Sequence, residues 1–550
     1  MPSLSPLSGV LGHRKAAHLL RRTTYRYTRT RVDELAALSA ADALASLLTA
    51  HPLQLEQPLY GPASTPKSWI NPPAPSGTPP PAEESELRPY VMGWWVHEAL
   101  HDPGISHKMM LFLHQYLAVD AESGSSAQFF DYLSLLRWAS LGNTKKLLVK
   151  VVTDNCMLTY LDNDQNFKGN PNENFAREFF ELFTIGTGPA AGPGDYTTYT
   201  EEDIVQTARV LTGFNHALRN QHSDPETGIP TGKAYPQSHD FGPKTFSPRL
   251  SNTVIEPPTQ DAAGMQKELE ALVDMVFAQE ETARNICRRL YRFLVTRKIS
   301  PEVEADIIGG LATTLRDQDF ELKPVLAQLL QSEHFFDADD TAPADEIVGA
   351  LIKSPLDLSL QALAFFQVPI PDPLSENSKH YLEFYNSTVI ERMLGTAGMT
   401  LFYPFDVAGY SGYYQQPDFN RQFFNSATII PRYKLPQVLL SGTHAWTGAS
   451  TLPIGTRLDI VDWVKNKSGI TDASDSFVLV KEMLQYLAPE EVSTARFDYF
   501  HLSIFLDNLP PNDWAYEWEH FLNTGDDSEV RIPLERLVNA IMYAPEYQVA

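Results

Sequence analysis

Cysteine is nearly absent from this 550-residue chain, in which only Cys156 and Cys287 occur. Both lie inside apolar helical patterns, so a disulfide framework and a zinc ribbon held by paired cysteines are excluded. Long apolar runs are absent too, and none reaches the roughly 18 residues that a membrane-spanning helix requires. The sequence therefore predicts no transmembrane segment.

Positive charge is scarce. Lys and Arg number 43 against 68 Asp and Glu, which gives a formal net charge of −25 at pH 7. Such a field repels nucleic acids and anionic lipids, so we expect no nucleic-acid partner. The one strong basic run is 13–31, HRKAAHLLRRTTYRYTRTR. We interpret it as a solvated helix and the loop after it, with a phosphate or polyanion site as the alternative.

Sequence signatures of several enzyme classes are missing. The chain has no Gly-rich phosphate loop and no Gly-x-Ser-x-Gly elbow, which argues against nucleotide and α/β-hydrolase chemistry. The first residues, MPSLSPLSGVLGHRK, lack the apolar stretch of a secretory signal peptide. We therefore expect a cytoplasmic protein, and the alternative is export to the periplasm or cell envelope with a partner.

What the sequence does contain is helical periodicity. Apolar residues recur at three- and four-residue spacing through most of the chain, and no stretch shows strong strand alternation. With 43% hydrophobic and 11% aromatic residues, the chain can bury a large core. We predict an all-α fold, a large multi-helix body with long irregular loops and little β structure. The stretch 213–257 is expected to be such a loop or a small hairpin.

The chain is longer than a single hydrophobic core usually supports, so we expect more than one packed region. Residues 1–51 are predicted to be an N-terminal helical segment, and the Pro-rich residues 52–86 a linker or surface excursion. Residues 87–345 form the predicted main helical core, which carries the NENFARE and HDFGPK motifs. Residues 346–550 are predicted to be a C-terminal helical region packed on that core.

The most informative segment is 170–186, NPNENFAREFFELFTIG. At about 100° per residue on a helix, Asn174, Arg177, Glu178 and Glu181 share one narrow arc, and apolar residues cover the remainder. So wide an apolar surface predicts a buried helix, whose polar stripe must be paired, ligated or facing a cavity. Pairing within the stripe at i,i+4 spacing and a metal or substrate site are both open.

Two further places carry candidate residues. His114 is a lone histidine in an otherwise apolar helix, where a hydrogen-bonded core residue is the alternative to a ligand. His239, Asp240 and Lys244 lie in a loop whose backbone geometry is constrained by the Gly-Pro pair just before Lys244.

A literal zinc-protease pattern also occurs, His97-Glu98-Ala99-Leu100-His101. It would place two imidazoles on one face of a helix, with Glu98 beside a metal-bound water and Glu122 as a third ligand. The helix is expected to end at once, in Asp-Pro-Gly, which speaks against such a site.

Several segments together resemble a bacterial family known as domain of unknown function 1800. The resemblance implies a mainly helical protein, often exported and frequently encoded beside a sulfatase-like or phosphatase-like protein, which is the expected protein partner. Two departures stand out, because Tyr116 occupies the place of the family's second histidine in His-Asn-His-Phe, and Phe214 that of a tryptophan. The matching segments are 18–22, 108–116, 157–186, 199–214, 239–246, 286–295, 329–337, 353–358, 401–410 and 544–548.

Our leading interpretation is an enzyme-like pocket for acid–base or metal-assisted chemistry on a polar substrate, which could be a saccharide. A divalent metal ion is the cofactor that such residues would hold. The alternatives are a non-catalytic scaffold or binding protein that works with an envelope or exported partner, and a His-Glu-x-x-His zinc hydrolase. The candidate catalytic residues are Glu178, Glu181, His239 and Asp240, and the candidate substrate-binding residues are His114, Tyr116, Asn172, Asn174, Arg177 and Lys244.

Overall fold

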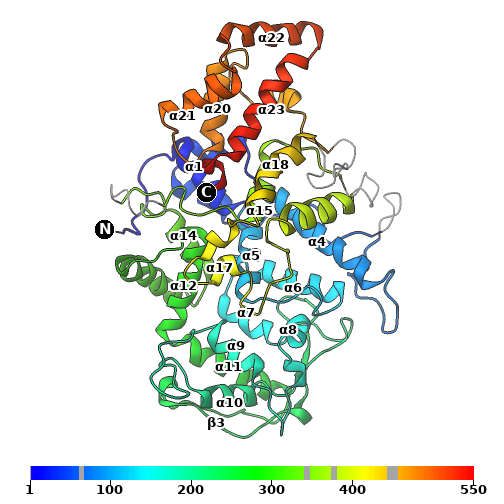
Figure 1. Ribbon diagram of the computed structural model, residues 1–550. Coiled ribbons are helices and arrows are strands. Elements are labelled where there is room, and N and C mark those ends of the chain that lie inside the picture. Colours follow the sequence, from blue (N-terminus) through cyan, green and yellow to red (C-terminus); the bar gives the residue numbers. More distant parts are fainter. Residues whose placement is uncertain (1, 61–66, 340–346, 373–380, 442–455) are drawn as a thin grey trace.

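A computed structural model describes residues 2–60, 67–339, 347–372, 381–441 and 456–550 (Figure 1). Helices dominate these residues, and strands occur only as two short antiparallel pairs. The predicted all-α fold class with little β structure is confirmed. Within the described ranges no helix has both the length and the apolar composition needed to cross a membrane.

The first half of the chain is a series of helices interrupted by short turns. Its elements are α1 Gly12–Thr23, α2 Arg29–Ala36, α3 Ala40–Leu47, α4 Glu84–His101, α5 Ser106–Tyr116, α6 Ser126–Ala139, α7 Thr144–Val151, α8 Asn155–Tyr160, η1 Asn163–Gln165, α9 Asn174–Glu181, α10 Glu201–Val210, β1 Phe214–Asn215, β2 Lys233–Ala234, η2 Pro236–Ser238, β3 Lys244–Thr245, η3 Pro248–Leu250, β4 Val254–Ile255, α11 Ala262–Phe277 and α12 Glu280–Leu294.

The second half is helical as well. Its elements are η4 Val303–Ile308, α13 Gly309–Asp317, α14 Leu322–Leu330, α15 Pro355–Phe365, η5 Glu383–Gly395, α17 Ser411–Tyr414, η6 Phe419–Phe423, α18 Ile429–Ser441, α19 Ile460–Asp462, η7 Trp463–Lys467, α20 Ser476–Leu487, α21 Thr494–Asp498, η8 Tyr499–Phe505, α22 Pro511–Thr524, α23 Ser528–Tyr543 and η9 Pro545–Gln548.

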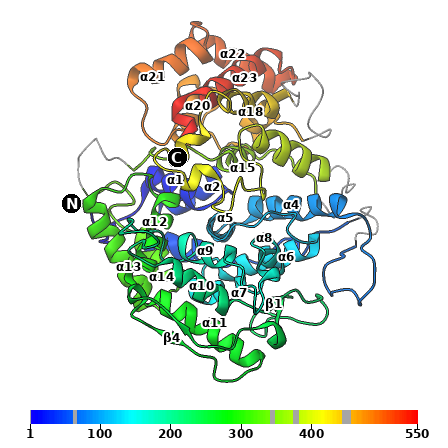
Figure 2. The same cartoon turned by 60° about the horizontal axis from the view of Figure 1, so that its bottom comes forward.

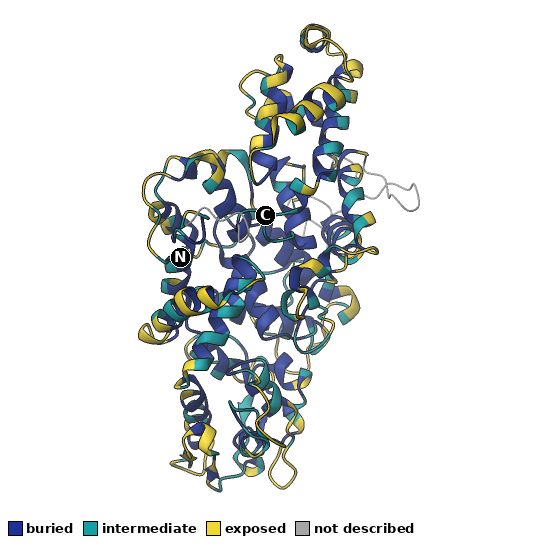
Figure 3. Ribbon diagram, turned by 60° about the vertical axis from the view of Figure 1, so that its left-hand side comes forward, coloured by how far each residue is buried: buried dark blue, intermediate teal, exposed yellow. Residues whose placement is uncertain are grey.

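The molecule is elongated, with α22 at one end and the short strands at the other (Figures 1 and 2). Buried residues run through its full length (Figure 3). One continuous hydrophobic cluster draws residues from each of the four predicted parts of the chain. The predicted boundary between 345 and 346 lies outside the described residues.

The two ends of the chain pack against each other. The Arg21 guanidinium on α1 donates hydrogen bonds to the carbonyl oxygens of Tyr486 and Ala488, at 2.6 and 2.9 Å. Arg21 and Arg22 are each only 2% exposed. The interpretation of the basic run as a solvated helix is therefore wrong for these two residues, because α1 lies beneath C-terminal segments that the sequence pattern does not reveal.

Within the Pro-rich segment predicted as a linker or surface excursion, the described residues 52–60 and 67–83 are anchored to α4 and α6. The indole N–H of Trp94 donates to the Leu55 carbonyl oxygen at 2.8 Å, and that of Trp69 donates to the Ser126 hydroxyl at 3.0 Å. Ile70 is fully buried. The described part of this segment is thus attached to the body by the hydrogen bonds of Trp94 and Trp69 and by the burial of Ile70.

The stretch predicted as a loop or small hairpin folds into two small antiparallel pairs. Phe214 faces Ala234 in the β1–β2 pair, and Lys244 faces Ile255 in the β3–β4 pair. Gly213, directly before β1, has a φ of +79°. A side chain is disfavoured in this left-handed conformation, so the glycine allows the chain to turn from α10 into β1.

Candidate functional site

The polar stripe of α9 lies at the rim of the molecule. Phe175, Phe179 and Phe180 are buried on the opposite face, and the Phe180 ring stacks on Tyr199 with 4.9 Å between centroids. The polar residues of α9 are intermediate or exposed. The expectation of a buried stripe is therefore wrong, because the apolar face of α9 alone supplies its packing.

Arg177 is fully engaged in ion pairs. Its guanidinium binds both carboxylate oxygens of Glu201 on α10, at 3.1 and 2.8 Å, and lies 3.8 Å from Glu181. Asn174 donates to the Leu161 carbonyl oxygen at 3.3 Å, and Asn172 to that of Asp162 at 3.2 Å. These residues join α9 to its neighbours.

Glu178 differs from the rest of the stripe. Its carboxylate makes no hydrogen bond and no ion pair with any described residue. Burial, followed by the nearby charge of Glu181, raises its pKa to about 7. Glu178 therefore exchanges a proton near neutral pH.

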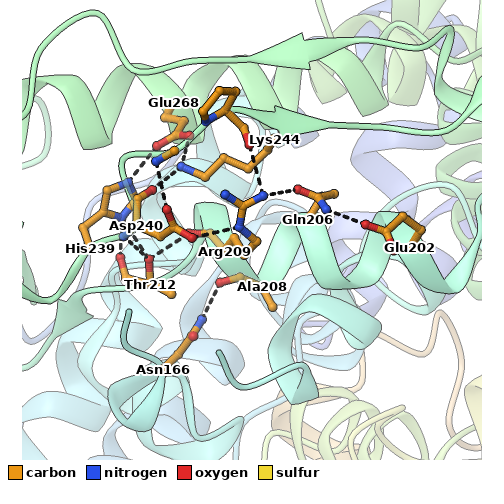
Figure 4. A network of polar contacts seen from close by, with 12 residues as sticks. Asn166, Glu202, Gln206, Ala208, Arg209, Thr212, His239, Asp240, Lys244 and Glu268 are labelled. Carbon is orange, nitrogen blue, oxygen red and sulfur yellow. Dashed lines mark hydrogen bonds and ion pairs between the residues drawn. The ribbon is translucent and has the colours of Figure 1, made fainter. Parts of the chain in front are cut away.

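The HDFGPK loop forms a closed polar cluster, with the side chains of His239 and Lys244 pointing at Glu268 on α11 (Figure 4). His239 Nε2 lies 2.7 Å from Glu268 Oε2, and Lys244 Nζ pairs with the other carboxylate oxygen. All three side chains are completely buried. His239 Nδ1 faces the carbonyl oxygen of Thr212 at 2.7 Å, so both ring nitrogens have internal partners.

Asp240 belongs to the same cluster but lies nearer its edge. Its carboxylate accepts hydrogen bonds from Arg209 Nε on α10 and from the Gly242 N–H, both at 2.8 Å. The structure thus brings three predicted residues together, His239, Asp240 and Lys244. They hold β3 and α11 to α10, and the two buried side chains offer no atom to a ligand.

His114 and Tyr116 on α5 are core residues. His114 is fully buried, its Nε2 lies 3.1 Å from the Val119 carbonyl oxygen, and burial lowers its pKa to about 4. The Tyr116 hydroxyl donates to the carbonyl oxygen of Phe183, directly after α9. Tyrosine at this position therefore links α5 to the segment that follows α9.

The zinc-protease pattern does not assemble a metal site among the described residues, in which no group of three potential ligands converges. His97 Nδ1 lies 2.9 Å from the Tyr385 hydroxyl, and His101 Nδ1 lies 2.7 Å from the His97 carbonyl oxygen. The Glu98 carboxylate instead accepts hydrogen bonds from the backbone N–H groups of residues 54 and 55, with N···O distances of 2.7 and 2.8 Å. Glu122 is exposed in the loop after α5.

A polar pocket of about 360 Å³ lies where η1, β1 and η2 meet, next to the loop that carries His239. The backbone N–H of Gly213 donates to the Asn166 carbonyl oxygen at 2.9 Å, and that of Lys168 to the Ser238 carbonyl oxygen at 2.7 Å. Asn172 donates its N–H to the Asn166 side chain at 3.0 Å. The pocket is lined by Asp164, Asn166, Phe167, Gly213, Asn215, Tyr235 and Ser238.

An aspartate–histidine pair stands at the edge of this pocket. His216 Nε2 lies 3.2 Å from Asp164 Oδ2, and His216 Nδ1 lies 3.3 Å from the Asn155 side-chain oxygen. The second carboxylate oxygen of Asp164 has no hydrogen-bond partner in the described part of the chain. Nearby, Phe167 is 46% exposed.

The sequence interpretation missed Asp164, Asn215, His216, Tyr235 and Ser238. Asp164 lies inside the segment 157–186, on which the family resemblance rests. Asn215, His216 and Ser238 lie just outside the segments 199–214 and 239–246, and Tyr235 lies between these two segments. Helical periodicity does not mark these residues, because they lie in irregular turns and short strands.

A family model described as "Protein of unknown function (DUF1800)" matches residues 18–549, nearly the whole chain. Comparisons with curated proteins and with solved structures gave no significant match.

Proposed function

This chain belongs to the DUF1800 family, and for this member we propose an enzyme-like function in which the pocket between η1, β1 and η2 binds a polar, hydroxyl-rich ligand of the saccharide class. Asp164 and His216 would act there as the acid–base pair. The observation that carries the proposal is this aspartate–histidine pair at the edge of a polar pocket of about 360 Å³.

The chemistry of the pocket walls suits such a ligand. A saccharide presents hydroxyl groups that both donate and accept hydrogen bonds, and C–H faces that pack on aromatic rings. The pocket is lined by the Ser238 hydroxyl, the Asp164 carboxylate and the rings of Phe167 and Tyr235. Its volume lies in the range of small-molecule sites, about 300–1,000 Å³.

In the proposed chemistry, Asp164 works through Oδ2, because its unpaired Oδ1 is buried. Oδ2 lies 3.2 Å from His216 Nε2 and orients the partly exposed imidazole, which takes the proton of an attacking hydroxyl as that oxygen bonds to the electrophilic carbon of the ligand and passes it to the oxygen that leaves. The walls carry one carboxylate among the described lining residues. The step therefore relies on a carboxylate–imidazole pair and not on the two carboxylates that most glycosidases use.

Saturation-transfer NMR with a panel of neutral and acidic saccharides tests the proposal. Wild-type protein is expected to bind at least one of them, and Phe167→Ala to weaken that binding by about tenfold through loss of the aromatic face. Phe405→Ala is the matched control, since Phe405 is 87% exposed and does not line the pocket. Asp164→Asn should keep binding and lose turnover. Equal binding by both phenylalanine variants would overturn the assignment.

A second candidate function is that of a non-catalytic scaffold. It is favoured by the internal pairing of the most polar motif residues, Arg177 with Glu201 and His239 with Glu268. A scaffold would bind no saccharide and would retain a protein partner in the Asp164→Asn variant, so pull-down of a sulfatase-like or phosphatase-like protein, the partner class that the family resemblance implies, distinguishes the two.

A further inference from the structure

A second, narrower cavity lies near the middle of the molecule, where α1, α5, α12, α15 and η6 approach one another (Figure 1). The saccharide pocket shares none of its lining residues. Five of the residues that line the cavity are cationic and one is a carboxylate. These charged residues are Arg21, Arg22, Lys108, Arg292, Lys353 and Asp357.

The cations are buried. Arg21 and Arg22 are each 2% exposed, and Lys108 and Lys353 are each 4% exposed. Charges taken out of water are unfavourable unless an opposite charge or several hydrogen bonds compensate them. Five cationic side chains around one cavity therefore favour a negative charge there beyond that of the Asp357 side chain.

Asp357 cannot neutralise the group, because both of its oxygens are already used. Lys108 Nζ pairs with Oδ1, and the Ser354 hydroxyl donates to Oδ2 at 2.8 Å. The acceptors of Arg21 are the Tyr27 hydroxyl and two backbone carbonyl oxygens, none of which carries a charge. Arg22 has one acceptor, the carbonyl oxygen of Ile347 at 2.7 Å.

Several donors in or beside the cavity have no partner in the described part of the protein. They include Arg21 Nη1, Arg22 Nε and Nη1, Arg292 Nε and Asn420 Nδ2, and the acceptor Asn420 Oδ1 lacks a partner as well. Lys353 Nζ lies 4.1 Å from the centroid of the Tyr547 ring and makes no hydrogen bond or ion pair with a described residue. These are buried donors of the kind that an anion satisfies.

We propose that this cavity is a binding site for a small inorganic anion held between Arg22, Lys353 and Asn420. Its volume of about 30 Å³ equals the share of one water molecule in the liquid, so an ion of chloride size fits without movement of side chains. A sulfate, phosphate or carboxylate group offers the same chemistry and enters if the half-buried Arg292 side chain moves aside.

The site is assembled from distant segments that the family resemblance already singled out. Arg21 and Arg22 come from 18–22, Lys108 from 108–116, Arg292 from 286–295, and Lys353 and Asp357 from 353–358. The bound ion would thus connect α1 with α5, α12 and the start of α15. It serves as a structural or regulatory ligand, independent of the chemistry in the saccharide pocket.

The pKa values of the cationic side chains around the cavity are consistent with an anion site. Burial, followed by the charge of Arg21, lowers the pKa of Lys353 well below its usual range, and the charge of Arg432 lowers it further while Asp357 raises it. Burial also lowers the pKa of Arg22 to about 9. A bound anion favours the charged form of both groups, so its binding should be accompanied by proton uptake.

Thermal unfolding of the full chain at constant ionic strength tests the site, with sodium gluconate as the reference salt and chloride, bromide, sulfate, phosphate and acetate as probes. We expect saturable stabilisation by halide, or by one of the oxyanions, and the comparison of probes identifies which. Titration calorimetry in two buffers should show the proton uptake. If no probe differs from gluconate, the site does not exist.

Charge-removing variants locate the effect. Lys353→Met is expected to fold, because it removes an uncompensated buried charge, and to weaken anion binding at least tenfold. Arg292→Met provides a second, less buried variant with the same expected direction. The control is Lys323→Met on the exposed face of α14, which should leave the response unchanged. An unchanged anion response in Lys353→Met and Arg292→Met would overturn the proposal, and so would the lack of density for the stabilising anion between Arg22 and Lys353 in crystals soaked with it.

Discussion

His239 Nε2 lies 2.7 Å from Glu268 Oε2, and neither side chain exposes any surface to solvent. The two residues are 29 positions apart, and their contact joins the loop before β3 to α11. Lys244 shares the same carboxylate. One buried carboxylate thus pairs with a lysine and contacts a histidine at once, which makes the cluster a fixed internal connection.

Replacing the buried Glu268 carboxylate should destabilise the folded protein. Glu268→Gln leaves Lys244 without its buried counterion, so we expect the free energy of unfolding to fall by about 3–5 kcal/mol. Glu270→Gln is the control, because Glu270 lies on the same helix and pairs at the surface with Lys267, which is 65% exposed. That variant should lose less than about 1 kcal/mol. Urea unfolding of both measures the difference, and similar losses would contradict a buried ionic role.

Alanine substitutions at Gly213 and Gly228 can separate two effects on stability, the strain of a left-handed backbone conformation and the steric clash of an added Cβ. Both have left-handed φ values, +79° and +71°. A Cβ at Gly213 would lie 2.9 Å from the Tyr235 carbonyl oxygen and 3.0 Å from the His239 nitrogen, whereas one at Gly228 meets nothing within 4 Å. Gly228→Ala should cost about 1–2 kcal/mol from conformation alone.

Gly213→Ala should cost at least about 2 kcal/mol more, because backbone atoms on both sides would have to move. It should also weaken ligand binding in the saccharide pocket, whose wall Gly213 forms. Thermal unfolding and saccharide titration check both effects. Equal losses of stability in the two alanine variants would show that the contact with Tyr235 and His239 is easily relieved.

The unpaired carboxylate of Glu178 predicts a pH-dependent stability. Burial first, and the charge of Glu181 second, raise its pKa from 4.5 to about 7. The folded state therefore holds the proton more tightly than the unfolded state, and this contribution to stability is lost as the pH rises from about 4.5 to about 7. Glu178→Gln, which stays neutral, should lack this loss.

At pH 8 the Glu178→Gln variant should be more stable than wild type by about 1–2 kcal/mol, a value reduced for the partial exposure of the group. At pH 4 the two should be equal. Glu202→Gln on the exposed side of α10 should show no such window. Urea unfolding across the pH range measures it, and a difference that is independent of pH would point to packing.

Glu98 is predicted to act as a structural acceptor. Glu98→Gln replaces one of two carboxylate oxygens that receive the N–H groups of residues 54 and 55. We expect a loss of about 1–3 kcal/mol, because one buried N–H would then face an amide N–H. Treatment with a zinc chelator should leave the melting temperature unchanged. A decrease on chelation, reversed by added zinc, would restore the zinc-hydrolase hypothesis.

The amphipathic pattern was sufficient to predict the helical class and the position of α9. Helix phase correctly separated its buried phenylalanines from Asn174, Arg177 and Glu178, because that separation depends only on neighbours three and four positions apart. The same local rule could not show that Arg177 is engaged by Glu201 while Glu178 stays unpaired.

What the sequence determined by itself is therefore local: a mainly helical chain, the polar face of α9, and the family to which the segments point. Only the tertiary structure decided that Arg21, Lys108 and Lys353 line one cavity, and that Asp164 meets His216 at the edge of another. The reason is physical. Such contacts join residues from about 50 to more than 300 positions apart, so they depend on how whole helices pack, which no periodicity records.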